Sequence, residues 1–155
     1  MSRSPPMFLA EANPLNASEL IFPALECIHI AGFALSVGTI AIVDFRLLGL
    51  GMRHQTPAEI AKDLGPWTLF GLAIMLFSGP LLFSSDPDMY YLNRSFQVKM
   101  VLLVLGIVFN YTIRRQTALS GASPFRSKLV ACISIALWVG VVFGGIFIAF
   151  VGQFV

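Results

Sequence analysis

Four long stretches of the chain carry almost no charge, and this pattern constrains the fold more than any other feature. No Asp, Glu, Lys or Arg occurs within residues 27–43, within residues 64–85 or after residue 128. A fourth stretch, between Arg94 and Arg114, is interrupted only by Lys99. A helix that crosses a bilayer needs about 20 largely apolar residues. We therefore predict four membrane-spanning helices, near residues 20–43, 66–84, 96–113 and 129–151.

The composition supports a membrane protein and excludes several other classes. Apolar residues make up 57% of the 155 residues and charged residues only 12%, against about 25% charged residues in a typical soluble domain. A chain this short cannot hide so much hydrocarbon from water, so part of its surface must face lipid. The net charge of +2 is too small and too scattered to indicate a nucleic-acid partner. We expect an all-α, integral membrane four-helix bundle that forms one domain over residues 1–155.

The basic residues predict the orientation of the bundle. Seven of them lie in or beside the first and third connections between spans, and only three lie on the opposite side. Basic residues are enriched in cytoplasmic loops, so both termini are predicted on the periplasmic side of a bacterial inner membrane. Pro66 is predicted to lie in the first turn of the second span, where proline is tolerated. The seven residues are Arg46, Arg53, Lys62, Arg114, Arg115, Arg126 and Lys128.

Ionisable residues inside membrane spans are costly, so each is a candidate for a functional site. Glu26 and His29 are three residues apart in the first span, which places them on one helical face. Lys99 begins the third span at about the depth of Glu26. An ion pair between Glu26 and Lys99 would keep both charges in the bundle, with His29 just beneath it. Such a pair is either a clamp between helices or part of a working site.

A second polar group is expected near the cytoplasmic surface. It contains Asp44, Arg46, Asn110 and Arg114, and Arg115 follows directly. Asn110 is eleven residues from Lys99, about three helical turns, so both point the same way. We expect Asp44 to pair with Arg46 or with an arginine of the third span, and the group to anchor helix ends.

His29 allows several interpretations. It could form a hydrogen bond between helices, as polar residues in membranes do, or serve as a haem ligand, a proton relay or a quinone contact. The only other histidine, His54, lies in a loop. A haem iron on His29 would therefore need Met75, Met100, a second subunit or a vacant position. Motifs of nucleotide-binding proteins and hydrolases are absent, and no catalytic residue is predicted.

The fourth span carries small residues at every fourth position. This spacing lets two helix backbones approach closely, either within the bundle or against a second copy. It is compatible with a homo-oligomer or with docking to a larger membrane complex. The residues are Cys132, Ala136, Gly140 and Gly144, with Gly145 alongside.

The chain resembles a bacterial four-helix membrane family known only as a domain of unknown function. The resemblance rests on Phe22-Pro23, Glu26 to His29, Gly32, residues 44–50, Pro66-Trp67, Gly79, Asn93, Phe96, Lys99 and Asn110. More loosely, the histidine of the first helix and the lysine of the third look like those of copper-resistance D-type proteins and J-type protoporphyrinogen oxidases. That resemblance implies haem or porphyrin chemistry at His29 and Lys99. Arg115 stands where many members of the closer family have a histidine, so two histidine ligands are not implied.

Together these features predict a small bacterial inner-membrane protein with a redox role associated with haem or quinone and centred on His29. Lys99 and Glu26 would complete the binding site, and haem b is the cofactor considered. The alternative is a non-enzymatic accessory subunit of a larger membrane complex. A small-solute transporter is disfavoured because internal repeats and broken helix pairs are lacking.

Overall fold

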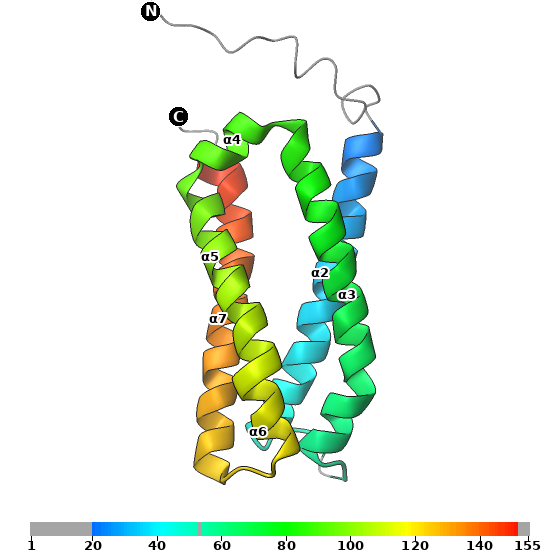
Figure 1. Cartoon of the computed structure of the whole chain (residues 1–155), viewed down its shortest axis with the longest axis vertical. Helices are drawn as coiled ribbons and strands as arrows, with labels where there is room; N and C mark the ends of the chain where they lie inside the picture. The colour runs from blue at the N-terminus through cyan, green and yellow to red at the C-terminus, as the bar shows by residue number, and fades with distance from the viewer. Residues whose placement is uncertain (1–19, 53, 152–155) are drawn as a thin grey trace, which may run out of the picture.

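The computed structural model describes residues 20–52 and 54–151, except for the side chains of 149–151. Its described residues are helical apart from short connections, and they contain no strand. The elements are α2 (Ile21–Leu47), α3 (Pro57–Ser85), α4 (Pro87–Leu92), α5 (Arg94–Phe109), a π-helical turn η1 (Asn110–Arg114), α6 (Arg115–Leu119) and α7 (Pro124–Val151). Figure 1 shows their arrangement as an elongated bundle.

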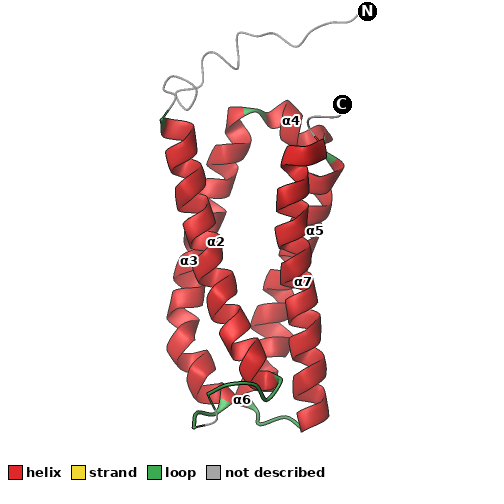
Figure 2. Cartoon of the chain, turned by 180° about the vertical axis from the view of Figure 1, so that it is seen from behind, coloured by secondary structure: helices red, strands yellow, loops and turns green. Residues whose placement is uncertain are grey.

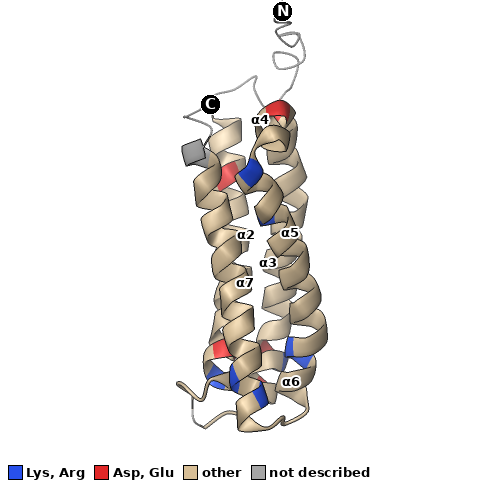
Figure 3. Ribbon diagram, turned by 90° about the vertical axis from the view of Figure 1, so that its left-hand side faces the viewer, with Lys and Arg blue, Asp and Glu red and all other residues tan. Residues whose placement is uncertain are grey.

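Four helices are long and apolar enough to cross a membrane, which confirms the predicted fold class and indicates a multi-pass membrane protein. They comprise Ile21–Leu47, Pro57–Ser85, Arg94–Leu119 and Pro124–Ile148. The third is continuous through α5, η1 and α6. Charged residues gather toward the two ends of the bundle (Figure 3), as expected where the helices leave the hydrocarbon of a bilayer.

The helices form two pairs. α2 packs along α3, α5 packs along α7, and α2 also contacts α7. The two pairs lie close together near α6 and stand apart over the other half, which α4 closes (Figures 1 and 2). We call these two regions the α6 half and the α4 half.

The second span begins earlier than predicted. Thr56 is the N-cap of α3, its hydroxyl accepts a hydrogen bond from the Glu59 backbone N–H, and the Glu59 carboxylate accepts one from the Thr56 N–H. This reciprocal capping box satisfies two otherwise unpaired donors, so the helix starts at Pro57. Pro66 and Pro80 both lie inside α3. The prediction that Pro66 starts the helix was wrong because the cap lies ten residues before it.

Two glycines let α2 and α3 approach to backbone contact. A Cβ atom built on Gly71 would lie 2.6 Å from the Gly32 carbonyl oxygen and 2.7 Å from the Ser36 backbone nitrogen. Only hydrogen at these positions allows the observed spacing. The close approach holds α2 against α3 just where the apolar core begins.

The apolar core fills the α6 half. One cluster of buried residues lies at mid-height, and a second lies nearer α6. In the α4 half, among the described residues, the only buried large apolar side chain is Ile148, at the end of α7. The α4 half is therefore not packed as a core. The mid-height cluster comprises Ile40, Leu72, Met75, Leu103, Trp138 and Val141, and the second comprises Val43, Leu47, Ile60, Ala118 and Ala131.

Candidate functional site

His29 lies one helical turn beyond the partly buried Phe33, where the apolar core ends on α2. Its Nδ1 atom is 2.8 Å from the Ser78 hydroxyl of α3. That hydroxyl donates its single proton to the Ile74 carbonyl oxygen at 2.7 Å. It therefore accepts from His29, and Nδ1 carries the proton. In the neutral ring Nε2 then has a free lone pair, because a neutral imidazole has one donor and one acceptor nitrogen.

The ring of His29 is held edge-on against α3. A Cβ atom built on Gly79 would meet the His29 Cε1 atom at 3.4 Å, so the Nδ1–Cε1 edge faces the α3 backbone. Nε2, the other ring nitrogen bonded to Cε1, forms no hydrogen bond with a side chain of the described residues. The backbone of Met75 also forms a hydrogen bond to the ring. The ring is half-buried.

Lys99 approaches the same region from α5. Its side chain runs along two glycines of α7: a Cβ atom on Gly144 would lie 2.9 Å from the Lys99 Cβ, and one on Gly145 would lie 3.5 Å from Nζ. The charge of Lys99 acts on the His29 ring. In the described part of the chain no hydrogen bond or ion pair to the ammonium group is found. Lys99 is thus a half-buried cation that has no counter-ion among the described residues.

The predicted ion pair between Glu26 and Lys99 is not formed. The only ion pair among the described residues joins two other side chains, Asp44 and Arg114. Glu26 is exposed near the start of α2 and acts electrostatically on Tyr90 of α4. The two residues lie at similar depths, but the Lys99 side chain packs against Gly144 and Gly145 of α7.

Three aromatic rings close the α4 end above Lys99. Phe83 of α3 and Phe96 of α5 are stacked with their centroids 5.6 Å apart, and Tyr90 of α4 lies 5.6 Å from Phe96 and 6.2 Å from Phe83. Burial, and after it the negative charge of Glu26, raises the pKa of Tyr90. Phe96 is three residues before Lys99, so along α5 it lies about one helical turn from Lys99 toward α4.

A second polar cluster lies in the α6 half and is fully buried. Arg114 and Asp44 are 6% and 1% exposed, and Nε of Arg114 donates to the Asp44 carboxylate at 2.5 Å. The other two guanidinium nitrogens donate to the Asn110 side-chain oxygen at 2.6 Å and to the Ile40 carbonyl oxygen at 2.7 Å. The pairing of Asp44 with an arginine of the third span is confirmed.

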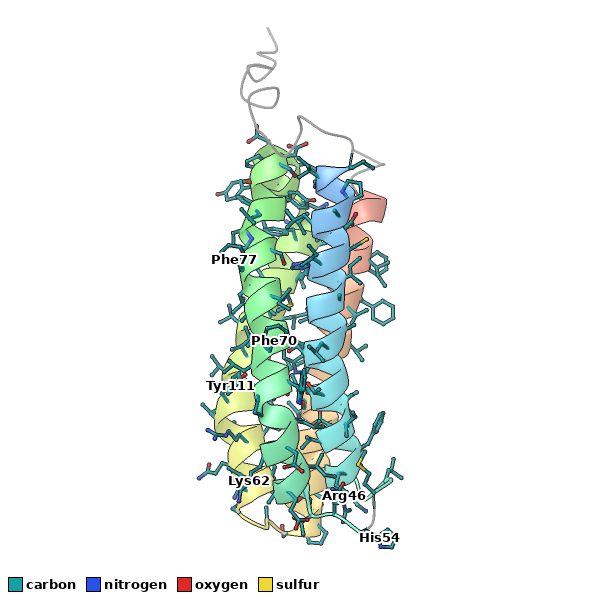
Figure 4. All side chains as sticks on the ribbon, turned by 90° about the vertical axis from the view of Figure 1, so that its right-hand side faces the viewer. Arg46, His54, Lys62, Phe70, Phe77 and Tyr111 are labelled. Carbon is teal, nitrogen blue, oxygen red and sulfur yellow. The ribbon has the colours of Figure 1, made fainter. Side chains whose placement is uncertain are left out.

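Arg46 does not join this cluster, contrary to the prediction. It is only two residues from Asp44, and residues so spaced do not share a helix face. Its Nε donates instead to the Gln55 carbonyl oxygen at 2.7 Å, in the loop before α3. Figure 4 shows Arg46 and His54 together at this end of the molecule, remote from the α4 half.

Sequence reasoning missed several members of the two clusters. Ser78 fixes the His29 ring, and the turn that carries Asn110 and Arg114 is π-helical, a form often found at functional sites. Four buried oxygen atoms have no hydrogen-bond partner among the described residues: Ser36 Oγ, Asp44 Oδ2, Thr117 Oγ1 and Ser134 Oγ. Serines in apolar runs gave no distinguishing signal, since many membrane serines bond only to their own helix.

The described residues contain no group of three or more His, Cys, Asp or Glu side chains placed to hold a metal ion. Met75, considered as a second iron ligand, lies in the mid-height core. Met100, the other candidate, is 40% exposed.

Comparison with known proteins gives one result. The model of a family described as "Family of unknown function (DUF6644)" matches residues 21–151, which is most of the chain. The chain belongs to the DUF6644 family. No curated protein and no solved structure matches it. Membership of the family agrees with the predicted resemblance to a membrane family of unknown function, and it assigns no activity.

The small residues of α7 are partly explained by packing within the bundle. A Cβ atom on Gly140 would lie 2.9 Å from a methyl carbon of Leu102 of α5, and Gly144 contacts Lys99. Cys132 and Ala136, at the other end of the stripe, are exposed. Gly140 and Gly144 thus serve the α5–α7 contact, and self-association stays a prediction.

Proposed function

We propose that this chain holds a redox-active ligand, a haem or a quinone, in the α4 half of the bundle. One observation carries the proposal. His29 is fixed by Ser78 through Nδ1, its Nε2 lone pair is free, and an unpaired Lys99 lies nearby, all just beyond the end of the apolar core.

The two polar groups suit either ligand. Histidines that bind metals commonly donate their second ring N–H to an oxygen, which orients the ring and strengthens the ligand, and Ser78 would do so for an iron on Nε2. Lys99 would then meet a propionate. For a quinone head group, Lys99 would donate a hydrogen bond to one ring oxygen, and His29 would face the other.

Some finer predictions belong to the same proposal. The distribution of basic residues supports an inner membrane of a bacterium, with both ends of the described chain on the periplasmic side. Kinship in function with copper-resistance D-type proteins or J-type protoporphyrinogen oxidases is supported by the histidine and lysine positions alone.

The test is to purify the full chain from membranes in mild detergent, with haem supplied during expression. Visible spectra of the reduced and oxidised protein detect haem, and chromatography of an organic extract detects quinone. His29→Ala should remove the bound ligand, whereas His54→Ala, a change in the exposed loop, should leave it in place. Well-folded protein with neither ligand would refute the proposal.

A second candidate, an accessory subunit of a larger complex, has one observation in its favour. Only 17% of the most apolar window of the third span is buried inside the bundle, against 33% for each of the other three. This exposed helix face could bind a partner instead of lipid. A partner that copurifies at a constant ratio, and is lost when Val101 and Leu105 of the exposed α5 face are both changed to Ala, would support this function.

A further inference from the structure

We propose that the site at His29 and Lys99 binds a hydroquinone, the reduced form of a membrane quinone. The inference rests on the proposed function and names its ligand. It concerns binding only.

The hydrogen-bonding character of the two groups selects the reduced form. The Ser78 contact leaves His29 with an acceptor at Nε2, while the Lys99 ammonium group can only donate. A hydroquinone hydroxyl can donate to Nε2, and its other oxygen can accept from Lys99. Both oxygens of an oxidised quinone can only accept, so the one facing Nε2 would lose its partner.

The surroundings favour a quinone over a haem. Of the two methionines that could complete an iron site, Met75 is packed into the core and Met100 faces outward at 40% exposure. Lys99 is the cation that acts on His29, whereas a haem carries two propionates. His29 supplies one acceptor and Lys99 one donor, which matches the two oxygens of a hydroquinone ring.

The site lies between two apolar layers of the bundle. The aromatic layer of Phe83, Tyr90 and Phe96 lies on the side of α4. The apolar core lies on the side of α6.

The experiment compares the two redox forms of one ligand. The full chain in lipid nanodiscs is dialysed without oxygen against short-chain ubiquinol or ubiquinone, and bound ligand is measured by chromatography. We expect the quinol to bind roughly tenfold more tightly, because the oxidised form forgoes one hydrogen bond at a buried acceptor. Equal affinity, or tighter binding of the quinone, would overturn the inference.

Single variants test which side chains cause the preference for the quinol. His29→Phe should remove the preference for the quinol, and Lys99→Met should weaken binding of both forms. Ser78→Ala tests whether Ser78 positions the His29 ring. It leaves His29 and Lys99 in place but frees the ring to present its N–H. The preference for the quinol should then fall while total binding persists. The matched controls are His54→Phe and Lys62→Met, at exposed positions near α6, which should leave both affinities unchanged.

Two outcomes separate this inference from the proposed function. A haem spectrum that depends on His29, without quinone binding, would refute the hydroquinone and leave the proposed redox ligand standing. Absence of both ligands from folded protein would refute both proposals.

Discussion

Removing Arg114 should destabilise the protein more than any other single change to an arginine. The guanidinium group donates three hydrogen bonds, to Asp44, Asn110 and the Ile40 carbonyl oxygen. Arg114→Met would leave the Asp44 carboxylate buried at 1% exposure without its cation. Its second oxygen, Oδ2, accepts no hydrogen bond of good geometry among the described residues, and the neighbouring Ser134 hydroxyl carries no charge that could replace the guanidinium group.

The expected size follows from the cost of an unpaired buried charge. Breaking a buried ion pair from one side costs about 3–5 kcal/mol, whereas replacing both partners with apolar residues is often close to neutral. Arg114→Met should therefore lower the free energy of unfolding by about 3–5 kcal/mol. Asp44→Leu should have a similar effect, since it leaves the guanidinium charge buried. The double variant should recover much of the loss.

Unfolding of the purified protein by SDS in mixed micelles measures these differences. The matched control is Arg115→Met, the adjacent but exposed arginine, which should change stability by no more than about 0.5 kcal/mol. The reasoning would be refuted if the two arginine variants were equally stable. It would also fail if the double variant lost the sum of the two single effects, because the charges would then act independently.

Three further predictions concern packing, capping and titration. Gly71→Ala should destabilise the bundle by roughly 1–3 kcal/mol, because its methyl group would lie 2.6 Å from the Gly32 carbonyl oxygen; Gly65→Ala, in open space on the same helix, should instead stabilise it by about 0.5–1 kcal/mol, as SDS unfolding would show. Thr56→Ala should cost about 0.5–2 kcal/mol through loss of the capping box, and hydrogen exchange should rise in the first turn of α3, whereas Thr56→Ser should behave like the wild type. Burial raises the pKa of Tyr90, so its phenol should ionise above the ordinary value of about 10 in an ultraviolet titration from which Tyr90→Phe removes that component. Because the folded state favours the neutral phenol, its contribution to stability is complete below the unfolded-state pKa and is lost as the pH rises through the folded-state pKa. Ionisation of Tyr90 at the ordinary pH would contradict its burial.

The four spans were predictable because lipid imposes a simple rule on sequence. Charges are excluded over about 20 residues, and this exclusion is visible without any knowledge of packing. The pairing of Asp44 with an arginine of the third span was predictable on the same basis, since a buried charge near the end of one span needs an opposite charge at the same level. Asp44 and Arg114 satisfied that condition.

The rotation of each helix about its axis was not predictable in the same way. Glu26 and Lys99 were paired because they lie at equal depth, yet depth does not determine the direction of a side chain. Glycines 144 and 145 lay the Lys99 stem along α7, a contact between residues 45 positions apart that no local pattern reveals. The π-turn at Asn110–Arg114 also has no sequence signature, because tertiary contacts of Arg114 hold it.

The two polar clusters differ in the one property that separates structural from functional groups. Arg114 has a protein acceptor on each of its three nitrogens and is surrounded by the packed α6 half, so its hydrogen bonds are made before any ligand arrives. Among the described residues, His29 and Lys99 each keep an unused bonding group in the half that lacks a core. An unpaired polar group in a membrane interior costs considerable free energy. A leucine at position 29 or 99 would avoid this cost. The ligand that we propose would complete the bonds of His29 and Lys99, whereas the Arg114 guanidinium already has its acceptors within the chain.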